Sequence, residues 1–273
     1  MQEYRKQEKP NIILIHSFPT NTIIIKGLLE YLEEFHNVYP IDLPGFVPES
    51  EPIPKVTIEN YAKAAQKQID ALGIDNYWMA GLSFGFLVAN LCSLDKRCFG
   101  TVGIVPYINK NYLIKNELLY FFLEKSFDMI RRFKWHEKAY RSSWLKKALL
   151  RETHTERINE VLSTVSAYTF FETALLLLKY DEEPVFHHKP YIFFLTEEDS
   201  TIRMEELAIL LNSIKNKRVV RTTCDHHPDE ITKQYFEANV NPQDHKAIVK
   251  FMLDYQYQTR FADNQDLDYR KRI

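Results

Sequence analysis

The chain has 273 residues, of which 45% are hydrophobic and 26% are charged, and its formal net charge at pH 7 is −2. These values are typical of one large globular domain, or of a domain with an insertion, that buries its core without disulfide bonds. The nearly balanced charge argues against a protein whose whole surface binds nucleic acid.

The ends of the chain and its cysteines carry no sign of export. The N-terminal residues lack the apolar run of a signal peptide, and the longest apolar run, Ala174 to Leu178, is too short to span a bilayer. The three cysteines, Cys92, Cys98 and Cys224, lack the spacing of metal ligands. We therefore expect reduced thiols, a cytoplasmic location and no transmembrane segment. The sequence leaves the oligomeric state open.

Up to residue 106, short apolar runs alternate with amphipathic segments. This pattern predicts strands at 11–15, 38–41, 77–82 and 99–106 and helices at 24–35, 58–72 and 86–94. We expect Gly73 to end the second of these helices in a left-handed conformation. Regular alternation of this kind is typical of an α/β protein with a mostly parallel sheet that helices cover on both faces.

The alternation stops between residues 107 and 189, where apolar residues recur at helical spacing and no strand is expected. It resumes with a strand at 191–195, a helix at 207–214, a strand at 218–222 and a helix at 245–255. We expect the polar tail, 256–273, to fray or to extend the last helix. The predicted organisation is a core made of residues 1–106 and 190–273, interrupted by a helical domain at 107–189.

The most informative motif is the run GLSFG from Gly81 to Gly85, which joins a predicted strand to a predicted helix. G-x-S-x-G in this position is the sequence of a nucleophile elbow, a turn so sharp that the residues two positions before and after the serine must lack a Cβ atom. Glycine is scarce in this chain, with 7 in 273 residues, so chance is a weak explanation. The alternative is a tight turn in which Ser83 only caps the helix.

Polar residues also follow the other predicted strands, whose carboxyl ends meet at one edge of a parallel sheet. His16 follows the first strand and Asp42 the second, whereas Asp199 and His226 follow the last two. We interpret His16 as a brace for its loop, and the run from Asp42 to Gly45 as a structural turn that Ser50 closes. A serine needs a base, an acid that orients the base, and donors for an oxyanion before it can transfer an acyl group.

In order and placement, these motifs resemble those of the α/β-hydrolase family, in its serine hydrolase branch with a helical cap. The resemblance implies an α/β-hydrolase core, with residues 107–189 as the cap. It implies that Ser83 is the nucleophile, His226 the base and Asp199 the acid of a catalytic triad. It further implies that the backbone N–H groups of Phe18 and Phe84 form the oxyanion hole.

Two of these positions have competitors in the sequence. Glu197 and Glu198 stand beside Asp199, but the end of a strand aims only one side chain inward, and the register favours Asp199. An acidic cap of the following helix is the structural alternative for this cluster. His227 directly follows His226 and remains a rival base.

Together, the motifs predict an enzyme that hydrolyses an ester-type bond without a cofactor or a metal. The aromatic and aliphatic residues of the predicted cap favour a small substrate with an apolar acyl or aromatic group. A carbon–carbon bond hydrolase of the same fold is an alternative. A non-catalytic binding protein is another, because Ser17, Phe86 and Asp225 depart from the family pattern. The basic stretch 125–151 is either a solvated face or a site for an anionic substrate or membrane surface.

Overall fold

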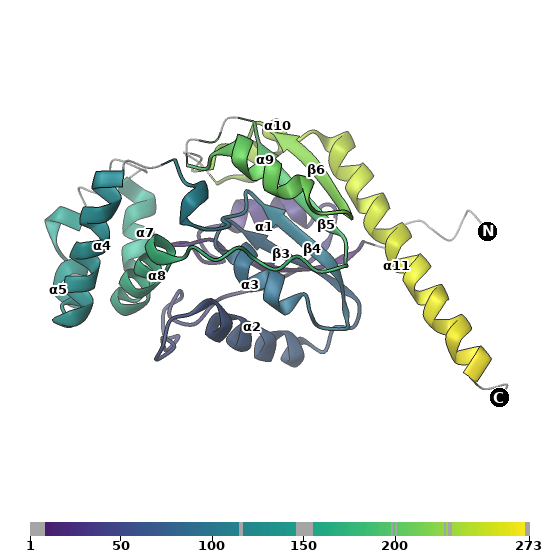
Figure 1. The fold of residues 1–273 in the computed structure, drawn as a ribbon, viewed down its shortest axis with the longest axis horizontal. Coiled ribbons are helices and arrows are strands. Elements are labelled where there is room, and N and C mark those ends of the chain that lie inside the picture. Colours follow the sequence, from purple (N-terminus) through teal and green to yellow (C-terminus); the bar gives the residue numbers. More distant parts are fainter. Residues whose placement is uncertain are drawn as a thin grey trace.

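The computed structural model describes residues 9–114, 117–145, 155–197, 199, 201–226, 228 and 231–270. Within these ranges all strands join one six-stranded parallel sheet of order β2-β1-β3-β4-β5-β6 (Figure 1). The strands are β1 Asn11–Ile15, β2 Asn37–Ile41, β3 Tyr77–Leu82, β4 Cys98–Ile104, β5 Tyr191–Thr196 and β6 Lys217–Thr222.

Helices cover both faces of the sheet because alternate residues of each strand point to opposite sides. Ile13 and Ile15 belong to the core on one face, whereas Ile12 and Leu14 belong to the core on the other. The helices on the first face are α2 (Ile58–Leu72), α3 (Gly85–Cys92) and α9 (Met204–Asn212). Those on the second face are α1 (Lys26–Leu32), α10 (Lys233–Asn239) and α11 (Pro242–Arg270).

A helical insertion separates two neighbouring strands. β4 and β5 pair directly, although residues 105–190 lie between them in the chain. The insertion gathers at the end of the molecule opposite the end of α11 (Figure 1). Its described helices are η2 Lys110–Tyr112, α4 Glu117–Arg132, α5 His136–Tyr140, α7 Thr155–Thr164 and α8 Ala167–Lys179.

Helix α8 fastens the insertion to the core. The N–H of Ser166 donates to the carbonyl of Gly45 at 2.9 Å, and the hydroxyls of Tyr61 and Thr173 lie 2.8 Å apart. No single described helix is long and apolar enough to cross a membrane. By length and composition alone, the helices Ile158–Thr164 and Ala167–Lys179 would together be long and apolar enough, but the chain bends by 111° between them.

Most expected elements occur close to their predicted bounds. All six strands begin and end within two residues of the prediction, and α2 has the predicted bounds. Gly73 ends α2 in the left-handed region with φ 63°, as expected. The first helix is shorter than the predicted range 24–35. It begins only at Lys26 because the side chain of Asn21 accepts the N–H groups of Ile23 and Ile24 and holds the preceding turn.

The C-terminal region differs most from the prediction. Residues 231–241 contain a helix, α10, that the sequence analysis did not predict, and Thr232 caps its N-terminus. The last helix begins earlier than expected, because Asn241 caps its first turn and Pro242 starts it. Its backbone continues to Arg270, so the tail extends the helix.

Two buried histidines connect the end of α1 to α11. Nε2 of His36 and Nε2 of His245 lie 2.9 Å apart, and Nδ1 of His245 lies 2.9 Å from the hydroxyl of Tyr31. The ring of His245 also stacks on Phe35 at 4.1 Å between centroids. Burial lowers the pKa of His245 to about 4, and burial together with the neighbouring His245 lowers the pKa of His36. Both rings are therefore neutral at neutral pH.

We predict that the free energy of unfolding falls as the pH drops from about 6.5 towards about 4. In this range the unfolded chain binds protons on its histidines that the folded chain does not bind. Acidification therefore favours unfolding by about 1.4 kcal/mol per pH unit for each such proton. Urea titrations at neutral pH and at about pH 5 measure the loss. The variant His245→Phe keeps a ring against Phe35 without the titrating group, so its loss should be smaller. Equal losses would contradict the assignment.

Candidate active site

Ser83 lies on the turn between β3 and α3 in a strained backbone conformation. Its φ is +48°, in the left-handed region that residues with a side chain seldom occupy. The N–H of Ser83 donates to the carbonyl of Ile104 at 2.9 Å, which fixes the turn against the end of β4. The N-cap of α3 is Phe84, and no side chain caps this helix. The hydroxyl of Ser83 is therefore not a helix cap, and that alternative is wrong.

The two glycines of the GLSFG motif are required by close backbone contacts. A Cβ atom on Gly81 would lie 2.4 Å from the carbonyl group of Gly85. A Cβ atom on Gly85 would lie 2.4 Å from the carbonyl oxygen of His16 and 2.5 Å from that of Ile15. Because these neighbours are backbone atoms, they cannot rotate away as a side chain does. The strand, the turn and the loop after β1 therefore fit together only with glycine at both positions.

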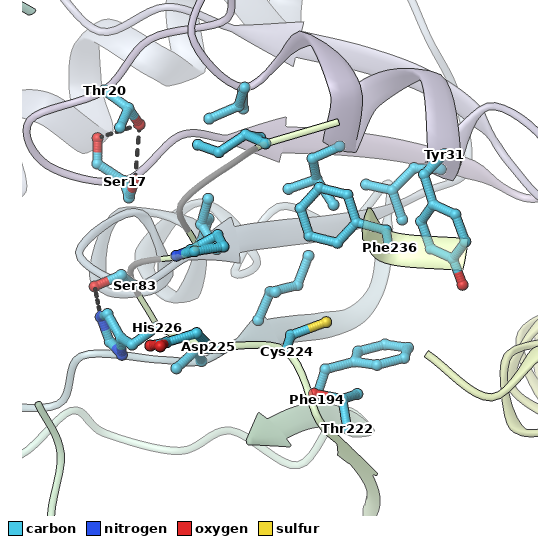
Figure 2. Close-up of a pocket in the computed structure, with 18 of the residues that line it drawn as sticks. Ser17, Thr20, Tyr31, Ser83, Phe194, Thr222, Cys224, Asp225, His226 and Phe236 are labelled. Atoms are coloured by element: carbon cyan, nitrogen blue, oxygen red, sulfur yellow. Dashed lines mark hydrogen bonds between the residues drawn. The ribbon is translucent and has the colours of Figure 1, made fainter. Parts of the chain in front are cut away.

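Three side chains predicted to act together form a chain of hydrogen bonds. Oγ of Ser83 lies 3.3 Å from Nε2 of His226, and Nδ1 of His226 lies 2.9 Å from Oδ2 of Asp199 (Figure 2 shows the first contact). The other carboxylate oxygen of Asp199 accepts the N–H groups of Thr201 at 2.7 Å and Ile202 at 2.9 Å. The three side chains follow β3, β5 and β6, so the carboxyl edge of the sheet brings them together.

The surroundings of Asp199 keep it ionised. Burial acts to raise the pKa of its carboxyl group, but hydrogen bonds from His226, Thr201 and Ile202 outweigh burial and hold the pKa below the ordinary value. A carboxylate next to Nδ1 favours the tautomer of His226 in which Nδ1 carries the proton. Nε2 is then the acceptor that faces the hydroxyl of Ser83, which is the arrangement that a general base requires.

The loop after β1 carries one of the predicted oxyanion donors. The hydroxyls of Ser17 and Thr20 lie 2.7 Å apart, and the N–H of Thr20 donates to the carbonyl of Ser17 at 3.0 Å, which makes a tight turn around Phe18. In the described part of the chain, the N–H groups of Phe18 and Phe84 donate to no other protein group. Both can therefore donate to an anionic oxygen, although their role in an oxyanion hole stays a prediction.

His16 and Asp42 support this loop. His16 is fully buried, its Nδ1 donates to the carbonyl of Ser17 at 2.8 Å, and its Nε2 accepts the N–H of Leu43 at 3.1 Å. Burial lowers the pKa of His16, so the ring is neutral. Asp42 accepts hydrogen bonds from both the N–H and the hydroxyl of Thr22. These contacts agree with the bracing and turn roles expected from the sequence.

Ser50 closes the turn that follows Asp42, as expected. Its hydroxyl accepts the N–H of Gly45 at 3.2 Å. Gly45 has a φ of +81°, and a Cβ atom there would lie 1.9 Å from the hydroxyl oxygen of Thr169 in α8. The turn therefore positions two segments: the loop to which it belongs, and the insertion, which lies over the sheet edge.

An apolar cavity of about 190 Å³ opens beside Ser83. Ile158 and Val161 of α7 line it from the insertion, and Leu82 and Ile104 line it from the sheet. It also extends to residues that carried no sequence signal of a site, because they belong to separate elements and look like ordinary core. These residues include Tyr31, Phe236, Val240 and His245.

The competing site residues are placed as follows. Glu197 is exposed, and its N–H extends the pairing of β5 by donating to the carbonyl of Thr222 at 3.0 Å. Glu198 and His227 lie outside the described residues. Among the residues that are described, no group of three or more His, Cys, Asp or Glu side chains could hold a metal ion.

Comparison of the sequence with protein-family models and with curated proteins finds no match. The fold, in contrast, is similar to solved structures. A thermophilic esterase from Thermogutta terrifontis gives a TM-score of 0.63 at 16% identity, over 92% of this chain and 93% of that one. The enol-lactonase from Burkholderia xenovorans LB400 gives 0.59 at 17% identity, over 92% of each chain. A haloalkane dehalogenase from Bradyrhizobium elkani USDA94 gives 0.65 at 11% identity, over 93% of each chain.

These similarities show the fold. The chain has the α/β-hydrolase fold, with a mostly parallel sheet between two layers of helices, as the sequence motifs predicted. At identities of 11% to 17% the similarity reaches no further than the fold. The chemistry must therefore be argued from the side chains of this protein.

We predict that Gly85→Ala lowers the melting temperature far more than Gly73→Ala. Gly73 ends α2 and Gly85 begins α3, but only Gly85 is in backbone contact with another segment. Gly73 has φ +63° and nothing within 4 Å of an added Cβ atom, so its replacement costs about 1 kcal/mol from backbone strain alone. Thermal unfolding of the two variants measures the difference. Similar melting temperatures would show that the loop after β1 can move away from Gly85.

Proposed function

We propose that the protein is a serine hydrolase that cleaves an ester-type bond of a small apolar substrate through an acyl-enzyme on Ser83. The observation that carries the proposal is the hydrogen-bonded chain from Asp199 through His226 to Ser83 beside an apolar cavity. The left-handed backbone at Ser83 and the glycines around it support the same proposal, because they match the geometry of a nucleophile elbow.

The proposed reaction uses only groups of this chain and water. Oγ of Ser83 attacks the acyl carbon while its proton passes to Nε2 of His226. Asp199 holds Nδ1–H of His226 and stabilises the imidazolium that forms. The N–H groups of Phe18 and Phe84 stabilise the oxyanion. His226 then protonates the leaving alcohol and activates the water that releases the acyl group.

We propose that residues 107–189 act as a cap over this site. Two residues of α7, Ile158 and Val161, line the cavity that also contains Ser83. Hydrogen bonds from α8 to Gly45 and Tyr61 hold the insertion at the carboxyl edge of the sheet, where the three polar side chains meet. We expect a cap in this place to exclude water from one side of the cavity, and exclusion of water strengthens the electrostatic interactions of a catalytic site.

We predict that a fluorophosphonate probe labels the wild-type protein at Ser83 and does not label Ser83→Ala. We further predict that His226→Ala lowers kcat for a short p-nitrophenyl ester at least about a thousandfold, because the serine then lacks its base. Circular dichroism confirms that each variant is folded. The matched control is His227→Ala, which should change kcat by less than about tenfold.

Three outcomes would change the proposal. A larger loss in His227→Ala than in His226→Ala would move the base by one residue. A folded wild-type protein that the probe leaves unlabelled would make it a binding protein on a hydrolase fold. Labelling without ester turnover, together with turnover of a ring-cleavage dienoate, would make it a carbon–carbon bond hydrolase.

A further inference from the structure

The cavity beside Ser83 continues into the body of the protein. Figure 2 shows Ser83 and His226 at one side of the cavity and Tyr31 and Phe236 at the other, with Cys224 between them. We call the part remote from Ser83 the inner arm. Its lining residues are Leu28, Tyr31, Leu32, Phe236, Val240 and His245.

The inner arm lies between the sheet and the helices that cover its second face. The described part of the insertion does not cover it. Leu28, Phe236 and Val240 belong to the core on the face that α1, α10 and α11 cover. Among the described helices of the insertion, only α7 lines the cavity, through Ile158 and Val161. A substrate attached to Ser83 can therefore extend in two directions, one towards α7 and one beneath α1.

The lining of the inner arm suits a hydrocarbon chain. Leu28, Leu32 and Val240 are buried aliphatic residues. Cys224 stands at the entrance, and burial raises the pKa of its thiol to about 11, so it is uncharged. An ionised group entering this space would lose its hydration without gaining a partner of opposite charge.

The far end of the inner arm is polar. The hydroxyl of Tyr31 and Nδ1 of His245 lie 2.9 Å apart, and His245 is further bonded to His36. These groups are already engaged with one another, so they close the arm instead of binding a charged ligand. The arm therefore sets an upper limit on the length of the chain that it can accept.

We propose that the inner arm binds the unbranched hydrocarbon chain of a medium-length acyl group, while the leaving alcohol lies on the side of α7. The hydrolysis of such a substrate rests on the proposed function, but binding of the chain does not. Burial of each methylene contributes about 0.8 kcal/mol, which is about fourfold in affinity. An acyl chain that fills the arm should therefore bind far better than acetate.

The first experiment measures binding without catalysis. Isothermal titration calorimetry of folded Ser83→Ala with sodium octanoate and sodium acetate should show at least about tenfold tighter binding of octanoate. Leu28→Trp in the same background fills the arm and should abolish the difference. Leu29→Trp is the matched control, because Leu29 is the next residue of α1 and does not line the cavity. Val240→Phe replaces Leu28→Trp if the latter does not fold.

The second experiment measures turnover of p-nitrophenyl acetate, octanoate and palmitate. We expect kcat/KM to be highest for the octanoate ester, and Leu28→Trp to lower the octanoate-to-acetate ratio at least about tenfold relative to Leu29→Trp. An unchanged ratio in Leu28→Trp, or equal binding of octanoate and acetate, would overturn the inner arm as the acyl site. Failure of the proposed function is distinguishable, because it abolishes turnover and probe labelling but leaves octanoate binding intact.

A second, independent observation concerns the outer surface of α4, which carries apolar residues on two opposite faces. Phe127 and Ile130 are buried against the rest of the insertion. On the other face, Leu118 is 65% exposed and Phe122 is 58% exposed. Met129 is also exposed, and so is Phe133, the residue directly after the end of α4. Successive members of this series are four, seven and four residues apart, which places all four along one side of the helix.

Cationic and aromatic groups border this apolar face. Lys125 follows Leu118 by seven residues, so it lies on the same side of α4. Its ammonium is 5.3 Å from the ring of Phe121. The ring of Trp135 stacks on Phe133 at 4.9 Å and has the ammonium of Lys138 5.5 Å from its centroid. Exposed Leu, Phe and Trp side chains mixed with lysines are the composition of helices that lie in a membrane interface.

We infer that this face of α4 docks on a lipid surface that contains anionic headgroups, since its apolar residues match the acyl boundary and its cations match the headgroups. Flotation with vesicles of phosphatidylcholine and phosphatidylglycerol should carry the wild-type protein to the top of a gradient. Vesicles of phosphatidylcholine alone should carry much less. Leu118→Glu combined with Phe122→Glu should reduce the floated fraction at least about tenfold.

The control is Ile209→Glu, which changes an exposed apolar residue on α9 and should leave flotation unchanged. Light scattering of the free protein tests whether a second copy covers the face. A stable dimer that the double substitution dissociates, together with no flotation of the wild type, would overturn the lipid assignment. Equal flotation of the wild type and the double variant would overturn it as well.

Discussion

The site depends on the close approach of two backbone segments where β3 turns into α3. Gly85 contacts the carbonyl oxygens at the end of β1, so the serine turn and the loop after β1 touch with no side chain between them. That contact packs the turn, in which Ser83 has its left-handed conformation, directly against the loop that leads to Phe18. A larger residue at either glycine would separate the groups on which the proposed oxyanion hole depends.

The sheet brings the other side chains of the site to Ser83, although they are far from it in the sequence. Asp199 and His226 are far from Ser83 in the chain, but each follows a parallel strand whose neighbours end at the same edge. Backbone N–H groups from Thr201 and Ile202 fix the carboxylate, and the carboxylate fixes the imidazole. The rigid order of the strands therefore determines which side chains meet, and the loops only adjust their final positions.

The sequence predicted the elements whose physical signals are local and left unpredicted those that depend on tertiary contacts. Most strands were recognisable because they are short apolar runs, and Gly81 with Gly85 marked the serine turn. The order of Ser83, Asp199 and His226 could be read from motifs, and the structure brings these side chains together, while their catalytic roles remain proposals. Helix α10 was not predicted, because seven residues with few apolar side chains give a weak periodic signal. The inner arm left no signal in the sequence, since its lining residues come from separate elements and look like ordinary core.

The inner arm is a cavity in the core, and a cavity lowers the stability of a fold. Apolar space that no side chain fills costs stability, because the residues that line it have fewer packing contacts on one side. Helices α1 and α10 would remove this cost by moving closer to the sheet. The hydrogen bonds among Tyr31, His245 and His36, together with the stacking of His245 on Phe35, fix the end of α1 to α11 and oppose that movement. A buried polar cluster on a face that is otherwise apolar thus acts as a spacer, and it keeps open a space that packing alone would close.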